Sequence, residues 1–267
     1  MKPFFFSICL LTTLAAHAQS FQVKDLLAAA HVEGSVTIYN VQNNTWYMSD
    51  SLDAIRTTQP ASTFKIINLL IALETGVINN LDDVMPWVGS TDTVKYGYRP
   101  DIYKNMTIRE AFQVSAGWVF IELAKKVGRK KYIHYLQAAG YGNNNLTEQG
   151  DDFWNFGAFG ISPKNQVEFI TKVYREQALP FQKKYITLLK EVMISEQNEQ
   201  FTTRSKTGWT RVDGQNIGWW VGYITSGQQT YCFATRVTRP LAQGSAGFSN
   251  CRKSITMEAC KRLGFLR

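Results

Sequence analysis

The most constraining feature of this chain is the stretch 60–73, which predicts a helix buried on nearly every side. Pro60 disfavours helical angles in the residue before it, so the helix begins after this proline. Residues 64–73 are apolar almost all round, which is typical of a core helix. Ser62 and Lys65 interrupt this pattern three residues apart, so a helix places both side chains on one face.

These two polar residues suggest chemistry. A lysine at the mouth of an apolar helix is costly unless its amine has a use. A serine hydroxyl within reach of an amine is a nucleophile beside a possible base. Because Ser-x-x-Lys occurs by chance about once in a chain of this length, Ser62 and Lys65 gain significance only from partners elsewhere.

The N-terminus is typical of a secretory signal peptide over residues 1–18. Lys2 supplies the positive start, residues 4–16 are apolar, and Ala16-His17-Ala18 has the form of a cleavage site. We therefore expect a secreted, periplasmic protein whose mature chain begins at Gln19. The apolar segment is too short for a stable anchor and no later stretch suits a membrane helix, so no membrane partner is predicted.

Length and charge limit the remaining possibilities. The 267 residues are 45% apolar, enough for a sizeable core, and we predict that 19–267 forms one domain. The net charge is +8, and its basic residues are scattered along the chain, which indicates a solvated surface that favours anionic substrates rather than nucleic acid. A monomer and a homodimer both remain open.

The mature chain has three cysteines, Cys232, Cys251 and Cys260. On a helix, Cys251 and Cys260 are roughly 13 Å apart, too far for a disulfide. Cys232 with either one stays possible, and free buried thiols are our default expectation. The histidines are isolated and no cluster has metal-ligand spacing, so we predict no metal.

The apolar period changes along the chain, which predicts an α+β fold. Residues 34–61 and 200–267 form an antiparallel sheet flanked by helices, and about 76–200 forms an all-helical lobe. The predicted elements are a hairpin over 34–49, a loop over 51–61, the Ser62 helix ending near Thr75, helices starting at Thr107, Val119, Pro163 and 182, strands over 201–210, 217–225 and 229–238, and a helix over 251–262.

Four further stretches raise the odds of catalysis: Ser115-Ala116-Gly117 between two helices, Tyr141-Gly142-Asn143 in a loop, Asp152-Phe153-Trp154-Asn155, and Lys206-Thr207-Gly208-Trp209 on a strand. Singly, each is more simply a cap, a turn, a core aromatic or a surface charge. Together and in this order, after Ser-x-x-Lys, they match the signature of serine β-lactamases and penicillin-binding proteins.

This set supplies what opening an amide-like carbonyl requires. Ser62 is the nucleophile, and its backbone N–H together with that of Trp209 forms an oxyanion hole. Gly208 lets a substrate lie against the strand. Lys206 and Ser115 relay a proton to the departing nitrogen.

The chain most resembles the class D, oxacillinase-type β-lactamases over essentially its whole mature length. The motifs that carry the resemblance are Ser62-Thr63-Phe64-Lys65, Tyr141-Gly142-Asn143, Phe153-Trp154, Ile161-Ser162-Pro163, Gln166-Val167-Glu168-Phe169, Lys206-Thr207-Gly208-Trp209, Gly218-Trp219-Trp220-Val221-Gly222 and Arg252-Lys253-Ser254-Ile255.

The resemblance implies β-lactam hydrolysis through an acyl-serine at Ser62, with no cofactor except CO2, which carboxylates Lys65 to make it the general base. It implies that Trp154 donates to this carbamate and that Arg252 binds the substrate carboxylate. Thr207, Gly208 and Trp209 are implied to bind substrate as well.

Two positions depart from the family pattern. Gly117 stands where the family usually has valine, and Asn155 where it usually has leucine. Both normally line the carbamate pocket, so we expect a wetter or wider pocket, weaker carbamate retention and altered water access. The same residues also serve proteins that acylate and deacylate slowly, so a penicillin-binding sensor domain or a D,D-peptidase is the alternative.

Overall fold

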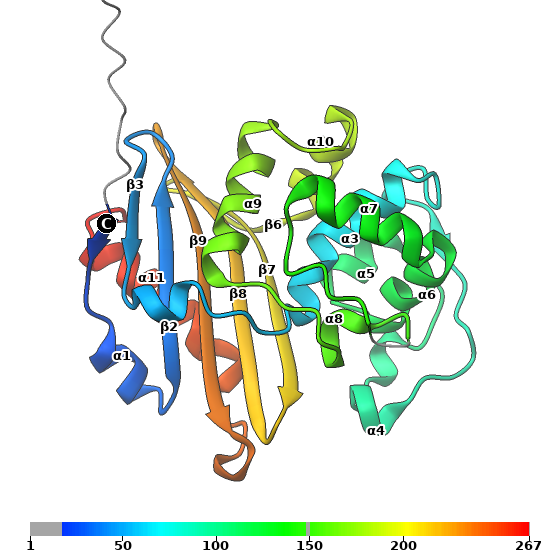
Figure 1. Ribbon diagram of the computed structural model, residues 1–267, viewed down its shortest axis with the longest axis horizontal. Helices are drawn as coiled ribbons and strands as arrows, with labels where there is room; N and C mark the ends of the chain where they lie inside the picture. Colours follow the sequence, from blue (N-terminus) through cyan, green and yellow to red (C-terminus); the bar gives the residue numbers. More distant parts are fainter. Residues whose placement is uncertain (1–17, 148–149, 267) are drawn as a thin grey trace, which may run out of the picture.

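The computed structural model describes residues 18–147 and 150–266, and shows a seven-stranded sheet with a helical lobe beside it (Figure 1). From edge to edge, the strands are β1 (Ala18–Ser20), β3 (Thr45–Met48), β2 (Glu33–Asn40), β9 (Gln229–Pro240), β8 (Gln215–Ser226), β7 (Thr202–Val212) and β6 (Ile194–Gln197). The predicted hairpin and the three later strands are confirmed.

The α+β prediction is confirmed, but the wholly antiparallel sheet is wrong at one edge. There β1 runs parallel to β3, with Ala18 opposite Trp46. The reason is α1 (Lys24–Ala29), a helix that the sequence analysis missed, which reverses the chain between β1 and β2. Apart from Ala18, the predicted signal peptide lies outside the described residues.

Helices cover both faces of the sheet. In Figure 1, α9 (Pro163–Arg175) lies in front of the central strands and α11 (Phe248–Arg262) behind them. Side chains alternate between the faces of a strand. Trp220 therefore packs with Phe248 in the cluster under α11, whereas its neighbour Trp219 joins the larger core shared with the lobe.

The centre of the lobe is α3 (Lys65–Glu74), in which every residue from Lys65 to Leu73 is buried. This confirms the core helix expected from its apolar sequence. The remaining elements are α2 (Ser51–Ala54), η1 (Ala61–Phe64), β4 (Val84–Met85), α4 (Thr93–Tyr96), η2 (Pro100–Ile102), β5 (Met106–Thr107), α5 (Ile108–Gln113), α6 (Gly117–Val127), α7 (Arg129–Ala139), α8 (Phe153–Phe156), α10 (Lys183–Val192) and η3 (Leu241–Gln243).

Helix ends predicted from capping residues are found where expected. The Thr107 hydroxyl accepts a hydrogen bond from the Glu110 N–H at 3.1 Å, at the start of α5. The Ser162 hydroxyl caps α9, with Pro163 as the first helical residue. Gly76 follows α3 with a φ of 70°, which suits a glycine after a helix end.

Other local features differ from the expectation. The segment 51–61 is not all loop, because Asp50 caps the short helix α2. The helix α7 was missed because only Tyr132, Leu136 and Ala139 of it are buried, a weak apolar pattern.

The three cysteines among the described residues are free thiols, as expected by default. Cys232 and Cys260 are buried, whereas Cys251 is only half-buried.

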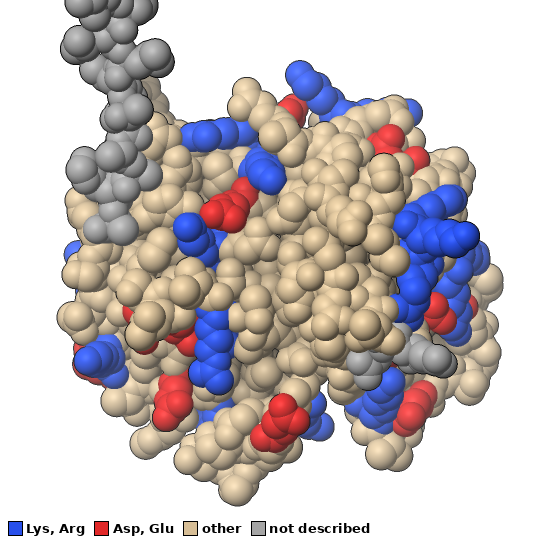
Figure 2. All heavy atoms as spheres, viewed as in Figure 1, with Lys and Arg blue, Asp and Glu red and all other residues tan. Residues whose placement is uncertain are grey.

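Basic side chains are less evenly spread than the sequence analysis supposed. In Figure 2, Lys and Arg are found over both halves of the visible face, with a denser group at the end of the lobe. The junction of α6 and α7 carries five exposed basic residues: Lys125, Lys126, Arg129, Lys130 and Lys131. Among the described residues, no helix is both long and apolar enough to cross a membrane.

Candidate active site

A cavity of about 480 Å³ lies between β7 and the helical lobe, and most of the predicted site residues line it. Ser62, Lys65, Ser115, Thr207, Gly208, Trp209 and Arg252 are all in its wall. So are Gly117 and Asn155, the two residues that depart from the family pattern. Residues from five separate segments of the chain therefore converge on one cavity.

The first predicted pair is in contact. Lys65 Nζ donates to Ser62 Oγ at 2.9 Å. The lysine is only 2% exposed, and this burial lowers its pKa from 10.5 to about 7, because the charged form loses its hydration. A neutral amine beside a hydroxyl is the arrangement that a serine nucleophile requires.

Ser62 does not lie in the α-helix that the sequence predicts but in the short 3-10 turn before it. It belongs to η1, a 3-10 turn, and α3 begins only at Lys65. The first bond of this turn runs from the Thr63 N–H to the Pro60 carbonyl at 3.2 Å. The Ser62 N–H precedes that bond, so the turn leaves it available as an oxyanion-hole donor.

A buried network fixes this turn from behind. The Thr63 hydroxyl donates to the Pro60 carbonyl at 2.7 Å and accepts from Gln166 Nε2 at 2.9 Å. The Tyr141 hydroxyl donates to Gln166 Oε1 at 3.3 Å. The sequence analysis gave Gln166 no role, although this amide lies three and four residues before Phe169 and Ile170, on the apolar face of the predicted helix. The Tyr141 loop thus supports the nucleophile from outside the cavity wall.

The second predicted pair joins residues 91 positions apart. Lys206 Nζ donates to Ser115 Oγ at 3.0 Å and also to the Thr207 carbonyl at 3.2 Å. Burial, the charge of Lys65 and then that of Arg252 hold the pKa of Lys206 well below its ordinary value. Ser115 has a φ of 61°, an uncommon angle for a side-chain residue, at the break between α5 and α6.

The edge of β7 supplies backbone donors to the cavity. β6 pairs with β7 only over Thr202–Arg204, and the Ser205 N–H then donates to the Met193 carbonyl at 2.8 Å on that same edge. Backbone groups alternate between the two edges of an antiparallel strand. The N–H groups of Thr207 and Trp209 therefore point toward this edge, where the cavity lies. The Trp209 N–H is therefore available to a ligand in the cavity, as its expected role in an oxyanion hole requires.

Gly208 has a structural reason as well as the expected one. A Cβ at this position would lie 2.8 Å from the Pro60 carbonyl oxygen and 3.1 Å from Thr63 Cγ2. On the side where a Cβ would point, the space beside Gly208 is therefore filled by η1, although Gly208 also lines the cavity. The missing side chain lets β7 approach the turn that carries Ser62.

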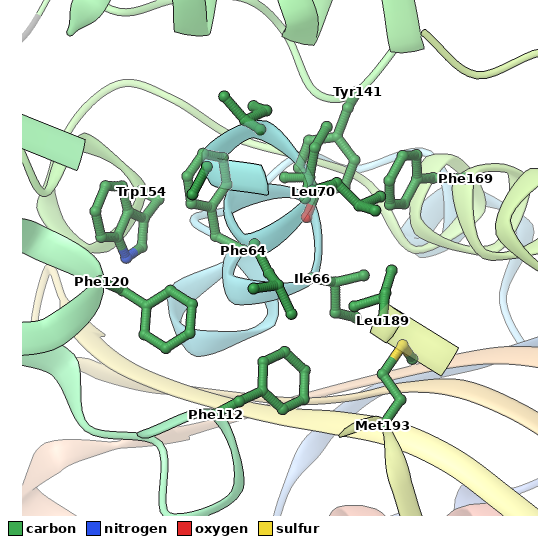
Figure 3. Packing of buried hydrophobic residues seen from close by; sticks show 14 of the residues in the cluster. Phe64, Ile66, Leu70, Phe112, Phe120, Tyr141, Trp154, Phe169, Leu189 and Met193 are labelled. Carbon is green, nitrogen blue, oxygen red and sulfur yellow. The ribbon is translucent and has the colours of Figure 1, made fainter. Parts of the chain in front are cut away.

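The predicted carbamate donor lies near the buried amine. Trp154 is 1% exposed and stacks on Phe64, with ring centroids 4.8 Å apart. Figure 3 shows the Trp154 indole nitrogen on the side facing Phe120. Lys65 Nζ lies 5.2 Å from the centre of that same Phe120 ring. The indole nitrogen and the amine therefore both lie near Phe120.

The two unusual residues, Gly117 and Asn155, both line the cavity. A Cβ built on Gly117 meets no atom within 4 Å, so a larger side chain would occupy free space. Asn155 sits beside Trp154 in α8 and presents an amide where an apolar side chain is usual. The expectation of a wider, more polar pocket agrees with this geometry.

The cavity wall is basic. It contains Lys65, Lys95, Arg99, Arg211 and Arg252 and, among the described residues, no Asp or Glu. Arg252 is 5% exposed and its Nε has no hydrogen-bond partner, although Nη1 reaches the Phe248 carbonyl at 3.4 Å. Burial lowers the pKa of Arg252 to about 10. An unpaired, buried guanidinium of this kind suits a carboxylate ligand.

The general class of the protein follows from a comparison with protein families. Residues 31–255 match the family model of the penicillin binding protein transpeptidase domain. The chain is 35% identical over 210 residues to the β-lactamase OXA-10 of Pseudomonas aeruginosa, covering 78% of this chain and 77% of the relative. It is 30% identical over 230 residues to OXA-48 of Klebsiella pneumoniae, covering 86% and 83%.

Solved structures agree with these relatives. The crystal structure of a class D β-lactamase from Sebaldella termitidis superimposes with a TM-score of 0.88 at 33% identity, covering 94% of this chain and 99% of that one. The chain belongs to the class D serine β-lactamases, within the penicillin-binding transpeptidase family.

Proposed function

We propose that this protein hydrolyses β-lactams through an acyl-enzyme on Ser62. Ser62 Oγ attacks the lactam carbonyl carbon, and the N–H groups of Ser62 and Trp209 stabilise the oxyanion. The C–N bond then breaks, and Ser115 passes a proton from Lys206 to the nitrogen. Water completes the reaction by attacking the ester. The observation that carries this proposal is the 2.9 Å contact between Ser62 Oγ and the buried amine of Lys65.

The base is Lys65. An ordinary lysine is neutral only about once in 2,500 molecules at pH 7, whereas burial lowers the pKa of Lys65 to about 7 and so makes the neutral amine far more abundant at this pH. The neutral amine attacks CO2, an N–C bond forms, one proton leaves, and the resulting carbamate supplies an anionic base. The residues around the amine suit this group, because the Trp154 indole N–H, which can only donate, and the Lys65 amine both lie near the Phe120 ring.

Recognition of the substrate follows from the charge of the wall. Arg252 binds the carboxylate that β-lactams carry beside the reacting ring. Thr207 adds its backbone N–H, which lies on the unpaired edge of β7. The absence of carboxylates from the described wall leaves no repulsion for this anion.

We further propose that the protein is exported to the periplasm. This rests on the form of residues 1–18, which have a basic start, an apolar centre and a small-x-small cleavage site. It predicts that the secreted chain begins at Gln19, which N-terminal sequencing of the protein from a periplasmic extract tests. Recovery of full-length protein from the cytoplasm alone would contradict it.

The decisive test of the reaction uses nitrocefin with purified protein, followed by intact mass measurement. Sustained hydrolysis, absent in Ser62→Ala, supports the proposal. One stoichiometric burst with a persistent adduct on Ser62 would instead identify a penicillin-binding sensor domain or a D,D-peptidase.

A further inference from the structure

Two segments 56 residues apart are joined at the rim of the cavity by Asp152. The Tyr96 hydroxyl donates to Asp152 Oδ2, and Lys95 Nζ lies 2.9 Å from the same oxygen. The Lys95 ammonium also lies 4.6 Å from the centre of the Phe156 ring. α4 and α8 therefore meet through one carboxylate, and Lys95, Tyr96 and Phe156 all line the cavity.

The helices α4 and α8 differ in the other contacts that hold each of them in place. In α8, Phe153 and Trp154 are buried in the aromatic cluster around Phe64. In α4 no residue is buried, and Val94 is 95% exposed. Buried packing thus anchors α8, whereas α4 has no buried residue as an anchor and packs on α8 only through the half-buried rings of Tyr96 and Phe156, with centroids 5.9 Å apart.

The contact is strong enough to act as that anchor. The Asp152 side chain is only 14% exposed, so its charge is partly withdrawn from water. Hydrogen bonds to an ionised group are about twice as strong as neutral ones. Burial and the Asp152 charge both raise the pKa of Tyr96, so the phenol stays a donor over the working pH range.

We infer that Asp152, Lys95 and Tyr96 form a clasp that positions residues 91–99 as the outer wall of the substrate cavity. This rests on the proposed function for its consequence. A β-lactam with its carboxylate at Arg252 and its carbonyl at Ser62 has its acyl side chain in the remaining part of the cavity. Thr91 and the segment from Lys95 to Arg99 supply that part of the wall. The clasp residues are positioning residues for side-chain binding.

The test compares two substrates in Asp152→Ala. For benzylpenicillin, which has an acyl side chain, KM rises roughly tenfold, the worth of one charge-assisted bond. For 6-aminopenicillanic acid, which lacks that side chain, KM changes less than about twofold, and kcat stays within about threefold for both. Asp152→Asn keeps an acceptor for Tyr96 and restores part of the loss.

Asp101→Ala is the matched control. It breaks the ion pair with Arg99 in the same segment, at 2.6 Å, but that pair does not reach α8. This variant should keep the wild-type KM for both substrates. An equal fall in kcat for both substrates in Asp152→Ala would overturn the proposal, since it would indicate damage to the reacting centre.

Hydrogen exchange separates this proposal from the proposed function. Amides of residues 91–99 should exchange faster in Asp152→Ala but not in Asp101→Ala, with no substrate present. Unchanged exchange in Asp152→Ala overturns the clasp, whether or not the wild-type protein hydrolyses β-lactams.

Discussion

Two serine–lysine pairs lie at the cavity. Their N–O distances are nearly equal, but one pair forms within a single turn and the other between distant segments of the chain. Lys65 donates to Ser62 at 2.9 Å within one turn of chain, and Lys206 donates to Ser115 at 3.0 Å from a strand to a distant loop. The pKa of Lys65 is lowered by burial alone, whereas that of Lys206 is lowered by burial and by neighbouring positive charges. Desolvation therefore accounts for the lowered pKa of Lys65, whereas the pKa of Lys206 is lowered both by desolvation and by the positive charge of Lys65.

This difference assigns the roles. Ser62 has an available backbone N–H and lies below the open edge of β7, where an oxyanion can be stabilised. Ser115 has a proton donor beside it in Lys206, which suits transfer to a leaving nitrogen. The pairs are therefore not interchangeable, and four substitutions test that claim in order of expected effect.

The largest difference is expected between the two serines. Ser62→Ala removes the nucleophile and should lower kcat for nitrocefin by at least about 10⁴-fold, with no covalent adduct. Ser115→Ala removes a proton relay and should cost about 10²-fold, with acylation still visible by mass. Steady-state kinetics and intact mass of both variants check this. Equal losses in the two variants would show that the pairs share one role.

The two lysines should differ in the step that they affect. Lys65→Met removes the base for both half-reactions, so turnover falls by about 10⁴-fold and any acyl-enzyme that forms persists. Lys206→Met should lower acylation by about 10²-fold without trapping the adduct. Single-turnover kinetics followed by mass separates the two. A trapped adduct in Lys206→Met but not in Lys65→Met would reverse the assignment.

The same substitution at Lys65 should stabilise the fold. The unfolded lysine holds its proton up to about pH 10.5, whereas the buried amine loses it above about pH 7. The unfolded state therefore binds more protons between these values, and the free energy of unfolding of the wild type rises with pH across this window. At lower pH the folded state bears the cost of burying the amine in its charged form, and Lys65→Met removes this cost.

Urea unfolding of Lys65→Met and the wild type at pH 7 and at pH 9.5 measures the effect. We expect the variant to be more stable at pH 7 by about 2–4 kcal/mol, with the gain shrinking at pH 9.5. Parallel pH profiles for the two proteins would contradict the lowered pKa.

The smallest effect concerns the open space beside the first pair. Gly117→Val fills a region in which a Cβ meets no atom within 4 Å. Excluding water there should favour carbamate retention, so the bicarbonate concentration for half-maximal activity should fall by roughly threefold to tenfold. Ala138→Val, which adds the same kind of side chain at an exposed position of α7 outside the cavity, is the control. The same bicarbonate requirement in Gly117→Val and the wild type would refute the proposed role of this gap.

The two pairs also show how far a sequence can be interpreted. Ser62 and Lys65 are close because helical geometry brings residues three apart together, which the sequence alone predicts. Ser115 and Lys206 meet only through the tertiary fold, so their contact was available only from a resemblance to a family. Arg252 was available in the same way.

Features that depend on the meeting of distant segments escaped the sequence analysis. The clasp of Asp152 with Lys95 and Tyr96 joins two short turns, neither of which has a periodic pattern. The parallel strand β1 depends on the reversal by α1, and Gly208 on the approach of β7 to η1. Local chemistry was predictable, whereas close approach between elements was not.

The central claim is that the buried, neutral amine of Lys65 captures CO2 and becomes the base for Ser62. Carbon-13 NMR of the protein in labelled bicarbonate tests it most directly. We predict one protein-bound carbamate resonance that rises with bicarbonate in parallel with activity and is absent in Lys65→Met. A fully active wild-type enzyme without that resonance would contradict the account.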